Sequence, residues 1–272
     1  MKLTQRITVL LFLLVGAVFS VLTVRDRFLA DRTPPVLHCA SGVLEISVNE
    51  PEETLLYGVT AIDDTDGDLS DQVLIQSVSP LITNDTAKVS YVVFDSANNM
   101  ATASRTIRYV DYQKPTFDLL SPLVFQVGKT VTLKDRLRAY DVIDGNITDN
   151  IRVTSQNLST QYEGAYTVTV QVTNSMGDSA SVPLRVVMAA QVSPQMIYLK
   201  DYIVYLELGE AYDAADNIRS VRTAEGDYGD PAEVQVSGAV DTSTPGVYDV
   251  LYTYTNGGRT YQVYLTAVVD EP

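Results

Sequence analysis

The chain has 272 residues, of which 46% are hydrophobic, and its 19 basic and 34 acidic residues give a net charge of −15. Residues 1–27 hold four basic residues and one acidic residue, so the remainder holds 15 basic and 33 acidic residues and carries −18. A surface this acidic repels nucleic acid and anionic lipid, which excludes nucleic acid as an expected partner.

An uncharged apolar segment occupies residues 7–24, with basic residues on both sides of it. A helix of this length spans about 27 Å, just enough for the hydrocarbon core of a membrane. The segment predicts a single-pass anchor in the cell membrane, and a cleaved signal peptide or a buried helix remains the alternative. Because positive charge flanks both ends, the acidic remainder decides the expected orientation: residues 1–6 form a short cytoplasmic tail and the C-terminal domains are extracellular.

The chain contains one cysteine, Cys39, and one histidine, His38. A disulfide within the chain is impossible, and we expect Cys39 to be buried, with pairing to another molecule as the alternative. The two residues are adjacent on a predicted strand, so their side chains point to opposite faces and cannot form a thiolate–imidazole pair. One histidine cannot build a zinc site alone, and we therefore expect no enzyme activity.

After residue 30, short alternating runs recur between turn residues, which is typical of an all-β sandwich. The clearest run is residues 166–172, Tyr-Thr-Val-Thr-Val-Gln-Val, in which one face is predicted to be core and the other solvent. Residues 246–256 repeat this strand and residues 89–95 repeat part of it. A final alternating strand follows each copy, at residues 101–110, 180–188 and 260–269.

Two acidic loops precede the first two copies, at residues 61–71 and 139–149. They share the pattern Asp-x-x-Asp-Gly-[Asp/Asn]-[Leu/Ile]-[Ser/Thr]-Asp, which begins at Asp63 in the first loop and at Asp141 in the second. An internal repeat of this length indicates tandem copies of one small domain.

The loop followed by a Gly-x-Tyr-x-Val-x-Val strand and an Asp- or Asn-containing turn resembles the bacterial Ig-like domains of Gram-positive surface proteins, which pesticidal crystal proteins also carry. Both motifs cover residues 34–188, and the strand motif alone extends the resemblance to residue 272. The resemblance implies an all-β fold of three tandem Ig-like β-sandwiches after an N-terminal transmembrane helix. Members of the family serve as spacers, adhesin stalks and accessory modules beside enzymes.

The matches place Ig-like repeat 1 at residues 34–111, repeat 2 at residues 112–190 and a divergent repeat 3 at residues 191–272. The short linkers between them each contain a proline, which predicts a rod of three beads with limited bending.

Tyr166 and Tyr248 lie two residues after Gly164 and Gly246, and this Gly-x-Tyr pattern predicts the tyrosine corner of an Ig fold. In the first repeat Asp85 and Ala87 stand at the glycine and tyrosine positions, so we expect its corner to be held differently.

The first acidic loop is a candidate calcium site. Asp63, Asp64, Asp66 and Asp68 place four carboxylates within six residues, and Asp111 in the following linker is a candidate for completing the site. The spacing is not that of an EF-hand loop, and the second loop has fewer carboxylates. The alternative is turn chemistry, in which Asp and Asn accept hydrogen bonds from nearby backbone and Gly supplies positive φ. We expect no other cofactor.

Repeat 3 contains ten of the 17 tyrosines and replaces the acidic loop by residues 223–230. Tyr198, Tyr202, Tyr205 and Tyr228 are predicted to be freer than the tyrosines of the core strands, and they are candidate contacts for a surface protein or polysaccharide. The alternative is that repeat 3 is a plain capping repeat.

These observations predict a non-enzymatic, membrane-anchored bacterial cell-surface protein whose Ig-like repeats act as a spacer or adhesion stalk. The alternative function is a carbohydrate- or cell-wall-binding accessory module that uses the Tyr-rich third repeat.

Overall fold

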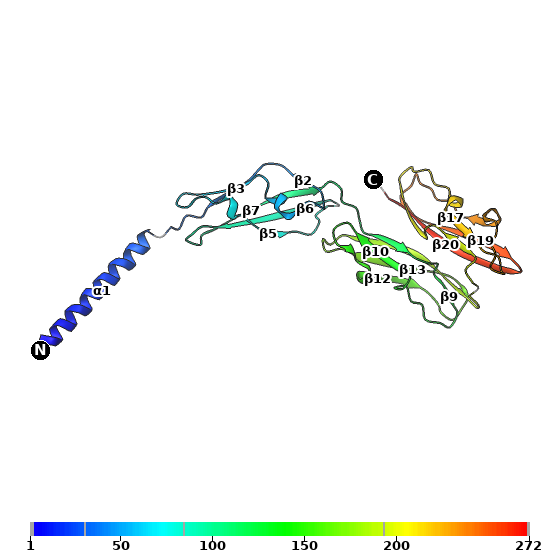
Figure 1. Cartoon of the computed structure of the whole chain (residues 1–272), viewed down its shortest axis with the longest axis horizontal. Coiled ribbons are helices and arrows are strands. Elements are labelled where there is room, and N and C mark those ends of the chain that lie inside the picture. The colour runs from blue at the N-terminus through cyan, green and yellow to red at the C-terminus, as the bar shows by residue number, and fades with distance from the viewer. Residues whose placement is uncertain (1–2, 30, 84, 193, 271–272) are drawn as a thin grey trace. The chain divides into compact units, whose positions relative to one another are not determined.

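The computed structural model describes residues 3–29, 31–83, 85–192 and 194–270, which form one helix followed by short strands and 3-10 helices (Figure 1). The chain divides into two compact units, Met1–Val110 and Asp111–Pro272. Unit 1 contains the helix and the first β-sandwich, and unit 2 contains the second and third sandwiches. We call the three sandwiches repeats 1, 2 and 3.

Helix α1 (Leu3–Leu29) contains the predicted apolar segment. Its most apolar window, Ile7–Val24, has a mean hydropathy of 2.7, and none of that window is buried within the structure. Phe12 and Phe19 are 77% and 70% exposed. By length and composition the helix can cross a membrane or serve as a signal sequence.

Repeat 1 is built from two sheets, of strand order β1-β3-β4 and β2-β7-β6-β5. Strand β6 buries Ala87, Val89, Tyr91 and Val93, because alternate side chains of a strand point to the same face. The elements of this repeat are β1 (Val36–Cys39), β2 (Leu44–Ile46), η1 (Glu52–Leu56), β3 (Val59–Asp63), β4 (Gly67–Asp68), η2 (Ser70–Gln72), β5 (Leu74–Val78), β6 (Thr86–Phe94) and β7 (Met100–Tyr109).

Repeat 2 has the same two sheets, of order β8-β10-β11 and β12-β13-β14-β9. In β13 the predicted inward residues Val168, Val170 and Val172 are buried. Its elements are β8 (Thr116–Leu119), β9 (Val124–Gln126), β10 (Leu137–Asp141), β11 (Gly145–Asn146), η3 (Thr148–Asn150), β12 (Arg152–Asn157), β13 (Gly164–Thr173) and β14 (Ser179–Ala189).

Repeat 3 has sheets of order β15-β17 and β16-β20-β19-β18. Tyr252 and Tyr254 take the core positions predicted from their alignment and are almost fully buried. Its elements are β15 (Ile197–Leu199), β16 (Ile203–Glu207), η4 (Ala214–Asn217), β17 (Ile218–Val221), η5 (Pro231–Glu233), β18 (Gln235–Ser237), β19 (Gly246–Asn256) and β20 (Arg259–Asp270).

The three repeats share one topology. In each, the second strand pairs in parallel with the last strand: β2 with β7, β9 with β14 and β16 with β20. The last two strands of each repeat form a long antiparallel hairpin. The prediction of an all-β chain of Ig-like sandwiches after an apolar helix is confirmed.

The tyrosine corners form as predicted. The Tyr166 hydroxyl donates to the Tyr162 carbonyl at 3.1 Å, and the Tyr248 hydroxyl donates to the Thr244 carbonyl at 2.8 Å. In repeat 1 the Tyr109 N–H donates to the Asp85 carbonyl at 2.8 Å, and the hydroxyl groups of Thr83 and Thr86 form a hydrogen bond in the same segment.

Repeats 2 and 3 share a buried apolar cluster, which includes Phe125 and Met188 of repeat 2 and Tyr261 and Val263 of repeat 3. A rod of beads joined only by linkers is therefore the wrong description of this pair, because the two sandwiches of unit 2 also pack against each other.

Polar groups add to the contact between repeats 2 and 3. The backbone N–H of Phe117 donates to the Tyr205 hydroxyl at 2.7 Å. Arg185 on β14 lies 3.7 Å from the Asp249 carboxylate on β19, measured from Nε to Oδ2, and its guanidinium carbon lies 5.3 Å from the centre of the Tyr264 ring. Tyr205 and Arg185 thus link repeat 2 to repeat 3.

We expect this junction to weaken at alkaline pH. Burial raises the pKa of Tyr205 from its ordinary value of 10.0 to about 12. In the unfolded chain the phenol ionises first, so the stability that Tyr205 contributes is fully present below pH 10 and is lost as pH rises toward 12. Thermal denaturation followed by circular dichroism should show a smaller loss of Tm across this range for Tyr205→Phe than for the wild type. Tyr162→Phe, at an exposed position of repeat 2, is the control, and equal pH dependence of Tyr205→Phe and wild type contradicts the assignment.

Candidate functional site

The first acidic loop is a tight hairpin between β3 and β4, in which Asp63 pairs with Gly67. The Oδ1 atom of Asp63 accepts hydrogen bonds from the backbone N–H groups of Thr65 at 2.8 Å and Asp66 at 2.9 Å. Gly67 has φ of +81°, a left-handed conformation that glycine adopts without steric cost. The loop therefore uses the turn chemistry that its sequence allowed as an alternative to calcium.

Asp66 ties this loop to the turn after β6. Its Oδ2 accepts from the Ser96 N–H at 2.8 Å and its Oδ1 accepts from the Ser96 hydroxyl at 2.9 Å. Asp68 is engaged locally, since its Oδ1 accepts from the Ser70 N–H at 2.9 Å and the Ser70 hydroxyl at 2.6 Å. These Ser70 hydrogen bonds lower the pKa of Asp68. Both carboxylates thus hold the loop in shape.

The second acidic loop repeats this geometry. Oδ1 of Asp141 accepts from the backbone N–H groups of Ile143 and Asp144, both at 2.9 Å. The Oδ2 atom of Asp144 accepts from the Ser175 N–H at 2.5 Å, and its Oδ1 atom accepts from the Ser175 hydroxyl at 2.6 Å. The two loops thus share a construction in which the first aspartate closes the hairpin and the second joins it to the neighbouring turn.

The two repeats differ beside the first aspartate. In repeat 2, Asn174 Nδ2 donates to Asp141 Oδ2 at 3.0 Å and also contacts the Tyr112 hydroxyl at 3.0 Å. That hydroxyl donates to Asp178 Oδ2 at 2.8 Å. Burial, followed by the negative charge of Asp178, raises the pKa of Tyr112, which keeps the hydroxyl protonated as a donor. The network around Asp141 is satisfied by the protein itself.

In repeat 1 the corresponding place holds three carboxylates. One oxygen from each of Asp31, Asp63 and Asp95 lies within 4.8 Å of the others. Asp95 stands where repeat 2 has Asn174, and it accepts from the N–H and the Nδ2 of Asn99, both at 2.7 Å. Among the described residues this is the group of carboxylates best placed to hold a metal ion.

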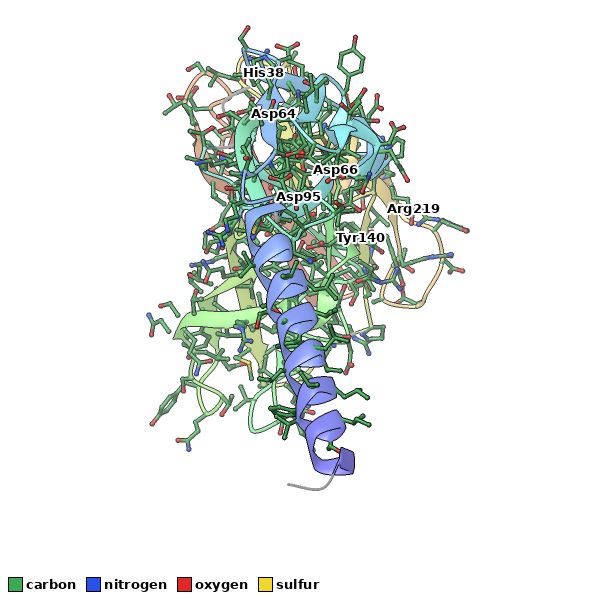
Figure 2. The ribbon with its side chains drawn as sticks, turned by 90° about the vertical axis from the view of Figure 1, so that its left-hand side faces the viewer. His38, Asp64, Asp66, Asp95, Tyr140 and Arg219 are labelled. Carbon is green, nitrogen blue, oxygen red and sulfur yellow. The ribbon has the colours of Figure 1, made fainter. Side chains whose placement is uncertain are left out.

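The predicted calcium ligands are thus not brought together as a set. Asp63 belongs to the three-carboxylate group, whereas Asp66 and Asp68 accept hydrogen bonds from Ser96 and Ser70. Asp64 is exposed on the loop (Figure 2). Asp111 belongs to unit 2, and its part in such a site stays a prediction.

Sequence reasoning missed Asp31 and Asp95. The signal for Asp95 was available, because the turn after β6 aligns with the turn after β13 and an aspartate there replaces Asn174. Asp31 lies five residues before the first strand of repeat 1, as Asp111 does before the first strand of repeat 2, but only the structure places Asp31 beside Asp63.

The four predicted contact tyrosines of repeat 3 have different environments. Tyr202 is only 7% exposed, and its hydroxyl accepts from Gln195 Nε2 at 2.7 Å, so its ring belongs to the core. Tyr205 is the junction residue described above, and Tyr198 is half-buried. Tyr228 is 75% exposed, with the Arg222 guanidinium carbon 3.6 Å from the centre of its ring. Of the four, Tyr228 is the most exposed, and Tyr205 is 36% exposed.

His38 and Cys39 lie on β1 with the side-chain alternation that was predicted. His38 is exposed and Cys39 is half-buried, so the expectation of a buried thiol is met only in part. Burial raises the pKa of the Cys39 thiol, and the positive charge of Arg105 acts in the opposite direction. A thiol with a raised pKa is a poor nucleophile at neutral pH.

Residues 204–265 match the family of the bacterial Ig-like domain (group 3). Within repeat 3 the sequence is therefore similar to a bacterial Ig-like domain. The family match falls on repeat 3, whereas the combined loop and strand motifs lie in repeats 1 and 2.

Two curated proteins are similar in sequence to parts of this chain. The pesticidal crystal protein Cry22Aa of Bacillus thuringiensis is 32% identical over 170 residues, which cover 59% of this chain and 23% of that protein. An uncharacterized 81.3 kDa protein of Acholeplasma phage L2 is 27% identical over 188 residues, which cover 67% of this chain and 24% of that protein. The chain thus spans about a quarter of the length of each relative.

The solved structures that match this chain include Drosophila N-cadherin EC1-4, with 16% identity, a TM-score of 0.29, and coverage of 85% of this chain and 74% of that chain. Another is the M60 catalytic domain with the CBM51-1 and CBM51-2 domains from Clostridium perfringens ZmpB, which is 14% identical, covers 88% of this chain and 31% of that chain, and has a TM-score of 0.25. TM-scores this low carry no argument about what these Ig-like domains do.

We expect the second aspartate of the loop motif to stabilise its repeat without any metal. Asp144→Ala removes both hydrogen bonds to Ser175, and because the pair is exposed the cost should be about 1 kcal/mol in the free energy of unfolding. Chemical denaturation in calcium and in EDTA should give the same loss. Asp149→Ala, an exposed aspartate of the same loop, is the control, and a loss seen only in calcium contradicts the structural role.

Proposed function

We propose that this chain is a non-enzymatic protein of the bacterial cell surface, held in the membrane by α1, whose extracellular Ig-like domains act as a spacer or adhesion stalk. The observation that carries the proposal is the exposure of α1. Its Ile7–Val24 window presents large apolar side chains all round, and soluble proteins rarely leave so much contiguous apolar surface in water. A membrane supplies the apolar surroundings that the rest of the chain does not.

The charge distribution supports an outward orientation of the domains. The residues after 27 carry a net charge of −18, from 15 basic and 33 acidic residues. The Ig-like domain family consists of non-catalytic modules, and the loop carboxylates Asp66, Asp68 and Asp144 are committed to hydrogen bonds within the fold. These features favour a structural role over catalysis.

The anchor is tested by expressing the chain in a bacterium and separating membrane from soluble fractions. The wild type should remain with the membrane after a high-salt wash and be released by detergent. Leu13→Arg combined with Val15→Arg should release it, since each arginine at the centre of a span costs about 3 kcal/mol of insertion free energy. Leu13→Ala combined with Val15→Ala is the matched control and should stay in the membrane.

Protease added to intact protoplasts tests the orientation and should degrade the Ig-like domains while cytoplasmic proteins survive. N-terminal sequencing distinguishes the alternative. A mature chain that begins after residue 20 shows a cleaved signal and contradicts the anchor, and intact domains after protease treatment contradict the extracellular orientation.

The second candidate function is binding of a cell-wall carbohydrate by repeat 3, and Tyr228 is the observation that favours it. Its ring is open to solvent, and Arg222 stacks against it and holds its orientation. A rigid, exposed aromatic ring is a common platform for sugar recognition. Elsewhere in repeat 3, a shallow depression of about 450 Å³ is lined by polar and aromatic side chains, among them Asp201, Glu210 and Tyr212.

Sedimentation of the purified chain with cell-wall polysaccharide tests this function. Tyr228→Ala should lower the bound fraction several-fold while the melting temperature stays unchanged, because the side chain is exposed. Tyr162→Ala removes an equally exposed ring from repeat 2 and is the matched control, which should bind as the wild type does. Equal binding by the two variants contradicts a sugar contact at Tyr228.

A further inference from the structure

The three-carboxylate group of repeat 1 is buried. Asp63 and Asp95 are 4% and 6% exposed, and Asp31 is half-buried. Carboxylates this close together and this far from water repel one another unless a proton or a cation lies between them. No described lysine or arginine forms an ion pair with any of the three.

Two oxygens of this group are buried and accept no hydrogen bond from the described part of the chain: Asp63 Oδ2 and Asp31 Oδ2. The other oxygen of each is engaged, since Asp63 Oδ1 closes the hairpin and Asp31 Oδ1 accepts from the Thr33 N–H at 2.9 Å. A buried carboxylate oxygen without a donor is costly. A cation in contact with both oxygens removes that cost.

Repeat 2 supplies an internal comparison. There the oxygen equivalent to Asp63 Oδ2 accepts from the amide of Asn174, and a tyrosine hydroxyl completes the network. Repeat 1 replaces that amide by the carboxylate of Asp95, which supplies acceptor oxygens where repeat 2 has an amide donor. The exchange removes a donor and adds a negative charge at the same place in the same fold.

We propose that Asp31, Asp63 and Asp95 form a binding site for one hard divalent cation, with calcium as the favoured ion. Calcium binds oxygen at 2.3–2.6 Å, so oxygens around one ion lie within about 5 Å of each other, as the three carboxylates do. Calcium takes six to eight oxygens in flexible geometry, which leaves positions for water. Magnesium requires a near-ideal octahedron at 2.0–2.1 Å and gives up its water molecules reluctantly, so a largely buried group of carboxylates favours calcium.

The site has a consequence for the segment that follows α1. Asp31 lies outside the strands, whereas Asp63 ends β3 and Asp95 follows β6. A shared cation therefore fastens residues 31–33 to the sandwich, in addition to the hydrogen bonds that Asn99 Nδ2 donates to the carbonyls of Asp31 and Thr33. If α1 is the membrane anchor of the proposed function, this cation stiffens the connection between the anchor and repeat 1. Cation binding itself does not depend on the proposed function.

Calorimetric titration of CaCl₂ into the full chain, purified in detergent and stripped with EDTA, tests the site. The wild type should show binding that Asp95→Asn abolishes. This variant copies Asn174 of repeat 2, so it is expected to fold, and circular dichroism checks that it does. Asp31→Asn lies outside both sheets and should weaken binding without affecting the fold.

Two charge-matched controls separate this site from the acidic loop and from general surface charge. Asp64→Asn removes a charge from the exposed residue next to Asp63, and Asp141→Asn changes the corresponding aspartate of repeat 2. Both should bind calcium as the wild type does. Absence of binding in the wild type, or equal loss in Asp64→Asn and Asp95→Asn, overturns the proposal, and equal affinity for MgCl₂ overturns the preference for calcium.

Limited trypsin digestion gives a second readout, because Arg32 lies between Asp31 and Thr33 and is exposed. Calcium should slow cleavage after Arg32 in the wild type and leave the rate unchanged in Asp95→Asn under the same conditions. Equal protection of both proteins contradicts the fastening of this segment. Fractionation results for α1 are independent of these measurements, so failure of the anchor and failure of the cation site remain distinguishable.

Discussion

In both repeats that carry the acidic loop, the aspartate at the end of the third strand is buried, and each of its oxygens requires a donor or a cation. One oxygen of Asp63 and of Asp141 is used in the same way, to close the hairpin. The other oxygen is served by Asn174 in repeat 2, whereas in repeat 1 it faces Asp95 and Asp31. The exchange of Asn174 for Asp95, together with the third carboxylate from Asp31, thus separates a turn satisfied by the protein from a candidate ion site.

The three sandwiches share one topology but differ in their surroundings. Repeat 1 adjoins the apolar helix and places its carboxylate group against the segment between them. Repeats 2 and 3 share a buried apolar cluster and a hydrogen bond through Tyr205, and they lie in one compact unit. Repeat 3 has lost the loop and presents Tyr228 on the turn that replaces it. The candidate cation site and the candidate contact tyrosine thus lie in different repeats.

Much of the fold was predictable because strand alternation and repeated motifs are local signals. The inward valines of β13, the tyrosine corners and the core positions of Tyr252 and Tyr254 all follow from period-two patterns and alignment between repeats. Local patterns failed where a side chain's environment depends on a distant segment. Tyr202 is buried by packing within repeat 3, and Tyr205 is engaged by the backbone of repeat 2.

The sequence by itself determined the apolar helix and the strand faces, since each depends on residues within one short segment, and it left calcium binding and turn chemistry as alternatives for the loops. Only the tertiary structure decided which carboxylates meet. Asp63, Asp64, Asp66 and Asp68 are neighbours along the chain, yet the hairpin directs them to different partners. Asp31, Asp63 and Asp95 lie about 30 residues apart and converge because sandwich packing brings the end of β3, the turn after β6 and the segment before β1 to one place.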